Sequence, residues 1–210
     1  KKLATSLPCA RMRPQNPKRR TSPKAGIVVL EFLEQEQISR ELLEGIRDYR
    51  AQYPAAPAMQ SRVPKPRYRY YGREVWEAAI AAILCVENLL LAGSKATGKN
   101  VLAENLAMVF GRPCWDVSFH VNMDAASLIG MDTFENGQVT FRPGPVYLCA
   151  KNGGFGSLDE INMAKNEALA VLHATLDFRR TIDVPGYDRV EVDPAARFIG
   201  TMNYGYAGTR

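Results

Sequence analysis

The segment GSKATGKN, at residues 93–100, constrains the fold of this chain more than any other feature. It agrees with seven of the eight positions of the phosphate-binding pattern Gly-x-x-x-x-Gly-Lys-Ser/Thr. The short apolar segment NLLLAG leads into it, and KNVLAENLAMVFG follows it with apolar residues at helical spacing. Strand, glycine loop and helix therefore occur in the order that a phosphate-binding loop requires, which predicts an α/β fold.

The loop itself is expected to hold phosphate groups mainly through its backbone. Glycine at 93 and 98 allows the amides between them to approach an anion closely, because glycine has no Cβ. Lys99 is expected to reach the β and γ phosphates, helped by the positive end of the helix that starts there. The residues predicted to bind the nucleotide are Gly93, Ser94, Lys95, Ala96, Thr97, Gly98, Lys99, Asn100 and Val101.

Asn100 is the one departure from the pattern, since a serine or threonine hydroxyl normally ligates magnesium at this position. An amide oxygen is also a hard ligand, but asparagine is longer than serine by one heavy atom. We therefore expect Asn100 to support magnesium indirectly, through a water molecule, in a working site. The alternative is a loop that binds nucleotide poorly.

Polar residues end two further apolar segments. GSLDEIN places Asp159 and Glu160 side by side, and RFIGTMN ends in Asn203. Magnesium-dependent hydrolysis needs one acid to hold the hydrated metal and another to polarise the attacking water. An asparagine amide can contact both the γ phosphate and that water. We predict Asp159 and Asn100 at the metal and Glu160, Lys99 and Asn203 as catalytic residues.

Strand-like and helix-like segments alternate after residue 70, which favours a parallel sheet with helices on both faces. An Asn-Gly pair between two strand-like flanks indicates an inserted hairpin. The predicted strands are at 114–121, 153–160 and 196–203, the predicted helices are at 74–85 and 166–178, and the hairpin is at 133–141.

The chain before residue 70 divides by composition. Residues 1–26 form a predicted basic, disordered tail, because residues 1–24 hold eight Lys or Arg and no acid. An amphipathic helix is predicted over 27–50, with a possible break near Ile38. Residues 51–69 carry four prolines and are predicted to be a linker. The main domain is expected to span 70–210.

Composition also bears on compartment and partners. No apolar run reaches the roughly 18 residues that span a bilayer, and the start has no apolar signal core, so we predict a cytoplasmic protein without membrane contact. The four cysteines form no C-x-x-C pair. Outside residues 1–24 the chain carries 19 basic and 22 acidic residues, so its main body is no basic surface for nucleic acid.

Four motifs in order resemble one family: LLLAGSKATGKNVLAENLA, FENGQVTFRPGP, GFGSLDEINMAKNEALAVLHATLD and FIGTMNYGYAGTR are similar to the AAA+ ATPases of the MoxR type, close to the CbbQ/NorQ and dynein-related branches. The resemblance covers residues 70–210. It implies a three-layer P-loop NTPase fold, ATP and Mg²⁺ as ligands, and the site roles given above. It also places Tyr71 and Gly72 near adenine.

The resemblance carries further expectations. The hairpin corresponds to the family's insertion in its second helix, and TIDVPGYDRVEV to the insertion before the sensor strand. The family's fifth strand, helical lid and arginine finger would lie beyond residue 210, which would leave the loop-bearing strand at an open sheet edge. A ring, expected to be a hexamer, and a von Willebrand A domain partner are implied.

Three functions follow as alternatives. The first is a chaperone-like remodeller driven by magnesium-dependent ATP hydrolysis. The second is a nucleotide-binding switch or scaffold with little hydrolysis, which the missing hydroxyl at Asn100 favours and the intact Asp159, Glu160 and Asn203 oppose. The third is a nucleic-acid-handling ATPase recruited through the basic tail.

Overall fold

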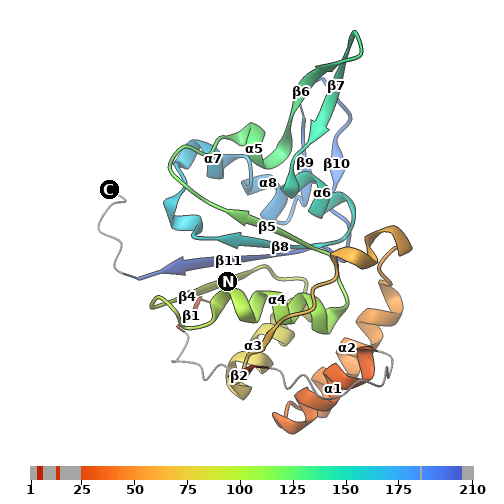
Figure 1. Ribbon diagram of the computed structural model, residues 1–210, viewed down its shortest axis with the longest axis vertical. Coiled ribbons are helices and arrows are strands. Elements are labelled where there is room, and N and C mark those ends of the chain that lie inside the picture. The colour runs from red at the N-terminus through yellow and green to blue at the C-terminus, as the bar shows by residue number, and fades with distance from the viewer. Residues whose placement is uncertain (1–3, 7–12, 15–24, 185, 205–210) are drawn as a thin grey trace.

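A parallel sheet lies at the centre of the computed structural model, which describes residues 4–6, 13–14, 25–184 and 186–204 (Figure 1). The strand order is β1-β4-β11-β8-β5, and every neighbouring pair is parallel. Four of these strands are the apolar segments predicted from the sequence, and β1 is an addition. The strands are β1 (Ala4–Ser6), β4 (Leu89–Gly93), β5 (Cys114–Ser118), β8 (Phe155–Asp159) and β11 (Arg197–Asn203).

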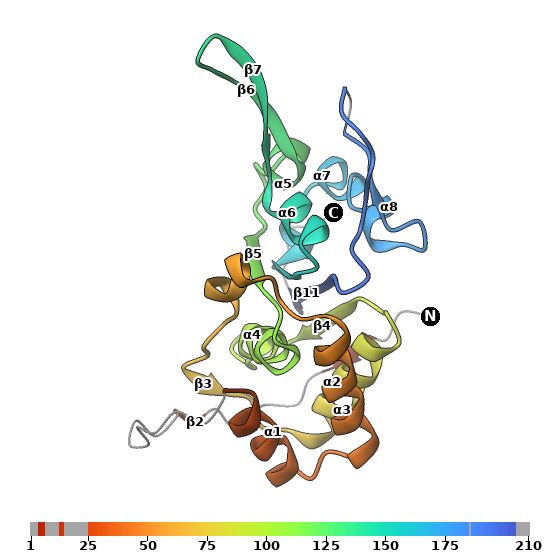
Figure 2. The same cartoon turned by 90° about the vertical axis from the view of Figure 1, so that its right-hand side faces the viewer.

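Helices cover both faces of the sheet, so the predicted three-layer α/β fold is confirmed (Figures 1 and 2). One face carries α1 (Ala25–Gln35), α2 (Arg40–Gln52), α3 (Arg73–Leu84) and α4 (Lys99–Phe110). The other face carries α5 (Ala125–Ile129), α6 (Pro145–Lys151), α7 (Asn166–Ala170) and α8 (His173–Leu176).

The alternation of side chains along the strands divides the core into two apolar clusters. Leu91 and Ile199 pack with the cluster of α1 to α4, whereas Leu158 and Phe198 pack with the cluster of α5 to α8. Helix α4 lies at the centre of the first cluster, where its Leu102 is fully buried. It ends at Gly111, whose left-handed φ of 66° lets its amide cap the last turn.

The N-terminal segment corrects two expectations. We predicted disorder over residues 1–26 and an open edge at β4, but β1 pairs in parallel with β4, from Ala4 opposite Leu90 to Ser6 opposite Ala92. Strand β2 (Arg13–Pro14) pairs with β3 (Tyr68–Arg69) in antiparallel fashion. Disorder is therefore wrong for these two short strands, because unpaired backbone groups at a strand edge offer a partner to any extended segment nearby. The other residues of that segment before residue 25 lie outside the described residues.

The segment predicted as one helix over 27–50 forms two, α1 and α2. The chain breaks between them at Gln37, whose φ of 60° is left-handed and incompatible with a continuing helix. Both helices pack into the same cluster as α4, with Leu33 and Ile46 fully buried. The Tyr49 hydroxyl donates to the carbonyl of Ala195 at 2.6 Å, which ties α2 to the segment before β11. Residues 27–50 are thus packed against the sheet domain.

The predicted linker at 51–69 has some regular structure. It contains a 3₁₀ helix, η1 (Pro57–Arg62), as well as β3. Proline at the first position of η1 is compatible with a helical turn, since its missing amide is not needed there. The stretch predicted as a linker therefore includes the last two residues of α2 and one 3₁₀ turn.

The second half of the chain carries two small insertions. The predicted hairpin is confirmed as β6 (Gly130–Glu135) and β7 (Gln138–Pro143), joined by Asn136 and Gly137 with φ of 52° and 79°. It projects well beyond the body of the molecule (Figure 2). Strands β9 (Thr181–Ile182) and β10 (Val190–Glu191) form a second antiparallel pair.

Two helical segments differ from the prediction. The helix expected over 166–178 is divided into α7 and α8, because the chain turns at Val171 and Leu172 to bury Leu172 in the second cluster. A 3₁₀ turn, η2 (Ile161–Met163), follows β8. In the part of the chain that the structure describes, none of the helices could span a bilayer.

Candidate functional site

The loop between β4 and α4 curls around the start of the helix. Ala96 and Gly98 have left-handed φ values of 59° and 82°, which turn successive amides toward one side, as in anion-binding nests. The Lys99 Nζ folds back over the loop and donates to the carbonyls of Gly93 at 3.2 Å and Ser94 at 2.7 Å. It also lies 3.4 Å from the Thr97 Oγ1. The amine therefore lies beside the loop carbonyls, and its contact with the β and γ phosphates stays a prediction.

The Lys99 side chain is largely buried. The residue is 6% exposed, and burial lowers the pKa of its amine, while the carboxylates of Asp159 and Glu160 act to raise it. The hydrogen bonds described for its amine go to carbonyl and hydroxyl oxygens, not to a carboxylate. An anion beside this amine would stabilise its charged form more than the present neutral partners do.

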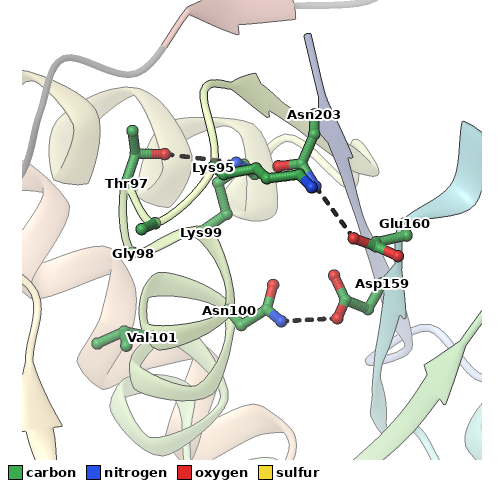
Figure 3. A pocket seen from close by; sticks show the side chains of 10 residues that line it. Lys95, Thr97, Gly98, Lys99, Asn100, Val101, Asp159, Glu160 and Asn203 are labelled. Atoms are coloured by element: carbon green, nitrogen blue, oxygen red, sulfur yellow. Dashed lines mark hydrogen bonds between the residues drawn. The ribbon is translucent and has the colours of Figure 1, made fainter. Parts of the chain in front are cut away.

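Asp159 ends β8 and faces the loop across the cavity (Figure 3). Its Oδ2 accepts a hydrogen bond from the Asn100 amide nitrogen at 2.8 Å. Its Oδ1 accepts one from the hydroxyl of Thr201, on the neighbouring strand β11, at 2.5 Å. Both carboxylate oxygens are therefore held by neutral donors from two different elements.

Glu160 follows at a left-handed turn, with φ of 53°. Its Oε1 accepts from the amide nitrogen of Asn203 at 3.1 Å (Figure 3). Asn203 is in register with Gly93, the last residue of β4, so the end of β11 lies beside the start of the loop. The three segments that the sequence singled out thus meet at one end of the sheet, as the carboxyl ends of parallel strands do.

These side chains share a cavity of about 380 Å³. It is lined by Lys95, Ala96, Thr97, Gly98, Lys99, Asn100, Val101, Asp159, Glu160 and Asn203, all of them predicted site residues. Gly93 and Ser94 contribute through the carbonyls that hold Lys99. Tyr71 and Gly72 do not line this cavity. Tyr71 packs edge-on against Phe32 at 5.3 Å, and the amide of Gly72 donates to Glu36 at 3.1 Å, so their contact with adenine stays a prediction.

The donor set bears on which cation fits. Among the described residues, no group of three or more His, Cys, Asp or Glu side chains could hold a metal alone. The Asp159 carboxylate and the side-chain oxygen of Asn100 are instead hard oxygen ligands, and both residues line the cavity beside the loop. Magnesium characteristically binds through one or two carboxylates together with water and substrate phosphates. The residues therefore fit a magnesium ion that is shared with a bound phosphate.

Thr201 is a site residue that the sequence analysis missed. It is 1% exposed and bonds to both acids, through the Asp159 carboxylate and the Glu160 amide. The available signal was its position two residues before Asn203, which puts both side chains on one face of the strand. A buried threonine in an apolar strand is ordinary enough that this signal is weak without a structure.

The comparison with protein families identifies the domain. The model of the AAA domain, dynein-related subfamily, matches residues 88–210. The chain belongs to this subfamily of AAA domains. The match includes every residue that lines the cavity and begins directly before β4. Membership supports an ATP-binding function for the AAA domain described here.

Several bacterial proteins are similar to this chain in sequence. The uncharacterized protein YojN of Bacillus subtilis is 37% identical over 179 residues, covering 83% of this chain and 57% of YojN. An uncharacterized protein of Staphylococcus epidermidis is 36% identical over 148 residues, covering 68% of this chain and 56% of that protein. The chain thus spans a little more than half the length of these relatives.

A solved structure supports the fold. The crystal structure of a candidate ATPase from Cytophaga hutchinsonii superimposes with a TM-score of 0.51 at 13% identity, covering 89% of this chain and 48% of that one. At this identity the similarity is evidence about the fold and not about the function. The α/β P-loop architecture predicted from the sequence agrees with it.

Proposed function

We propose that this AAA domain hydrolyses ATP with Mg²⁺. The observation that carries the proposal is the single cavity in which Lys99 and the loop lie opposite Asp159 and Glu160. Binding of phosphate alone would need only the loop and its lysine. The two acids at the end of β8, with Asn203 bonded to the second, supply what hydrolysis requires in addition.

Each residue then has a distinct part. The loop amides and Lys99 hold the phosphate chain and offset its negative charge. Asp159, with Asn100 beside it, faces the place of the cation, which would draw charge from the phosphate oxygens when bound. The Glu160 carboxylate takes a proton from the attacking water. Asn203 holds that carboxylate through its amide nitrogen, which limits the directions in which it can accept the proton.

The test is phosphate release by the full-length protein, measured with Mg²⁺ and with EDTA over a range of protein concentrations. We expect release that depends on Mg²⁺ and whose rate per molecule rises with concentration, as it does when neighbouring subunits complete a site. Binding of ATP without any Mg²⁺-dependent release at any concentration would contradict the proposal.

Asn100→Thr tests the one departure in the loop. We expect this variant to bind ATP in the presence of Mg²⁺ less than about tenfold more tightly than the unchanged protein, because Asn100 already lies against Asp159 and supports the same region. The measurement is ATP affinity with and without Mg²⁺. A gain beyond about a hundredfold, roughly 2.7 kcal/mol, would show that the native loop is a poor one.

One observation favours the second candidate, a nucleotide-binding switch with little hydrolysis. The Asn100 amide donates to Asp159 at 2.8 Å, and this bond must rearrange if a cation takes that carboxylate oxygen. A slow rearrangement would limit turnover without preventing nucleotide binding. The Glu160 variant discussed below separates the two functions.

The assembly and the cellular role are also proposals. Membership of the dynein-related subfamily and the resemblance to MoxR-type proteins support a hexameric ring with chaperone-like remodelling activity, and a von Willebrand A domain protein as partner. A cytoplasmic location stays a prediction from the sequence. Of the eight basic residues in 1–24 that would recruit nucleic acid, Arg13 alone lies in the described part of the chain, so that alternative gains no support here.

A further inference from the structure

We infer that Thr201 is a positioning residue that sets the geometry of both acids through one buried hydroxyl. This inference rests on the proposed function, because it concerns how the two acids come to face the same cavity. Thr201 does not line that cavity itself and is 1% exposed. Its effect on hydrolysis would therefore pass through Asp159 and Glu160.

Two consecutive strand residues normally point to opposite faces of a sheet. Along β8, Phe155 packs in the cluster of α1 to α4 and Leu158 in the cluster on the other face. By this alternation Asp159 faces α4, as Phe155 does, whereas a regular continuation would send Glu160 to the opposite face. Both acids nevertheless line the cavity. The left-handed turn at Glu160, with φ of 53°, ends the strand and redirects the second acid.

That turn has an energetic cost, because a residue with a Cβ is strained in the left-handed region by about 1–2 kcal/mol. It also removes Glu160 from the strand ladder. The pairing between β8 and β11 ends at Leu158 opposite Gly200, whereas β11 continues beside β4 as far as Asn203. The amide of Glu160 therefore needs a partner other than a ladder carbonyl.

Thr201 is the first residue of β11 beyond that last pair. Its hydroxyl oxygen takes the place of a backbone carbonyl as the acceptor for the Glu160 amide. The Glu160 amide donates to the Thr201 Oγ1 at 3.2 Å, which satisfies the amide in the turned conformation. The same oxygen donates its own proton to the Asp159 Oδ1. One hydroxyl thus holds the turn that aims Glu160 and fixes the side chain of Asp159.

Among the described residues, no other side chain bonds to both Asp159 and Glu160. Asn100 holds only the second oxygen of Asp159, and Asn203 holds only the side chain of Glu160. Loss of the hydroxyl would leave a partly buried carboxylate oxygen and a backbone amide without these partners at once. Hydrogen bonds that orient a metal-ligating side chain typically affect metal affinity or activity about 10- to 100-fold.

The test compares three variants of the full-length protein. Thr201→Val keeps the shape and removes the hydroxyl, and Thr201→Ser keeps the hydroxyl and removes the methyl group. Thr175→Val is the matched control, because Thr175 is also fully buried and its hydroxyl lies 3.5 Å from a backbone carbonyl, that of Thr181. The readouts are kcat and KM for phosphate release, melting temperature, and the affinity of a fluorescent ATP analogue with Mg²⁺ and with EDTA.

We expect Thr201→Val to lower kcat about 10- to 100-fold and to reduce the gain in analogue affinity that Mg²⁺ confers, while affinity in EDTA changes less than about threefold. Thr201→Ser should restore both values to within about threefold of the unchanged protein. Thr175→Val should leave both kcat and the Mg²⁺-dependent gain in affinity within about threefold of the unchanged protein, since its hydroxyl contacts neither acid.

Equal losses of kcat and of the Mg²⁺-dependent gain in affinity in Thr201→Val and Thr175→Val would overturn the inference, as would failure of Thr201→Ser to restore these two values. If the unchanged protein releases no phosphate, the proposed hydrolysis fails, and the Mg²⁺-dependent gain in analogue affinity alone decides the role of Thr201. If that gain is also absent from the unchanged protein, the inference is overturned as well, since Asp159 then has no cation-linked role for Thr201 to support.

Discussion

Glu160→Gln is expected to bind ATP about as tightly as the unchanged protein and to release phosphate at least about a hundredfold more slowly. A glutamine side chain has the size of glutamate, and its amide oxygen can still accept the hydrogen bond from Asn203. It cannot accept a proton from water at neutral pH. The binding site should therefore survive while the chemical step is lost, which phosphate release at saturating ATP and a separate binding titration would show.

The control for this change is Glu167→Gln, in which an exposed glutamate of α7 loses the same charge. We expect Glu167→Gln to release phosphate at an unchanged rate. If Glu160→Gln also releases phosphate at the original rate, Glu160 is not the base and the proposed mechanism of ATP hydrolysis is contradicted. Slow release by the unchanged protein, together with tight binding, would support the nucleotide-binding switch instead.

Lys99→Met is expected to weaken ATP binding at least about a hundredfold, roughly 2.7 kcal/mol. The methionine side chain has nearly the length of lysine but no charge, so the loop would face the phosphates with its backbone amides alone. Burial already disfavours the charged amine in the state described here, as its lowered pKa indicates. Removing the amine should therefore affect nucleotide affinity far more than folding, which a thermal melt without nucleotide would check.

Lys151→Met is a suitable control, because Lys151 is exposed at the end of α6, where it lies over the ring of Tyr147. The same charge is lost there, and ATP affinity should stay within about twofold of the original. Equal losses of affinity in both variants would point to a general effect of net charge. If Lys99→Met binds ATP as tightly as the unchanged protein, Lys99 and its loop do not bind the phosphates.

The sequence could indicate which residues come together because the features that mark them are local. A glycine at each end of the loop, a lysine at the start of a helix, and polar residues at the ends of apolar strands each follow from short segments. Parallel strands then place these ends together without further information. The structure accordingly brings Lys99, Asp159, Glu160 and Asn203 into one cavity.

The contacts missed from the sequence are those between distant residues. The Thr201 hydroxyl matters because β8 ends before β11 does, and that stagger depends on the register of the sheet. The direct bond from Asn100 to Asp159 likewise depends on the distance between α4 and β8. The expectation that Asn100 supports magnesium through a water molecule stays a prediction beside this contact. Spacing along the chain does not set either distance.

The ends of the helices could be predicted less accurately than the presence of helical structure. One amphipathic helix was predicted over 27–50, but the structure has two, and in α2 Ile46 is fully buried and Arg50 donates to the carbonyl of Val109 at 2.9 Å. Amphipathic periodicity shows that one face is covered and does not show by what. The break between α7 and α8 had no glycine or proline to mark it.

The packing of α1 and α2 against α4 also determines how the molecule can be shortened. A fragment that began at residue 70 would expose the face of α4 that these two helices cover, and it would lose Leu33, Ile46 and Tyr49 from the core. Each such side chain contributes about 1.5–3 kcal/mol through burial, whereas an entire domain of this kind is stable by only about 5–15 kcal/mol. The fragment would therefore tend to aggregate, and a protease that cut at this point would leave both pieces associated.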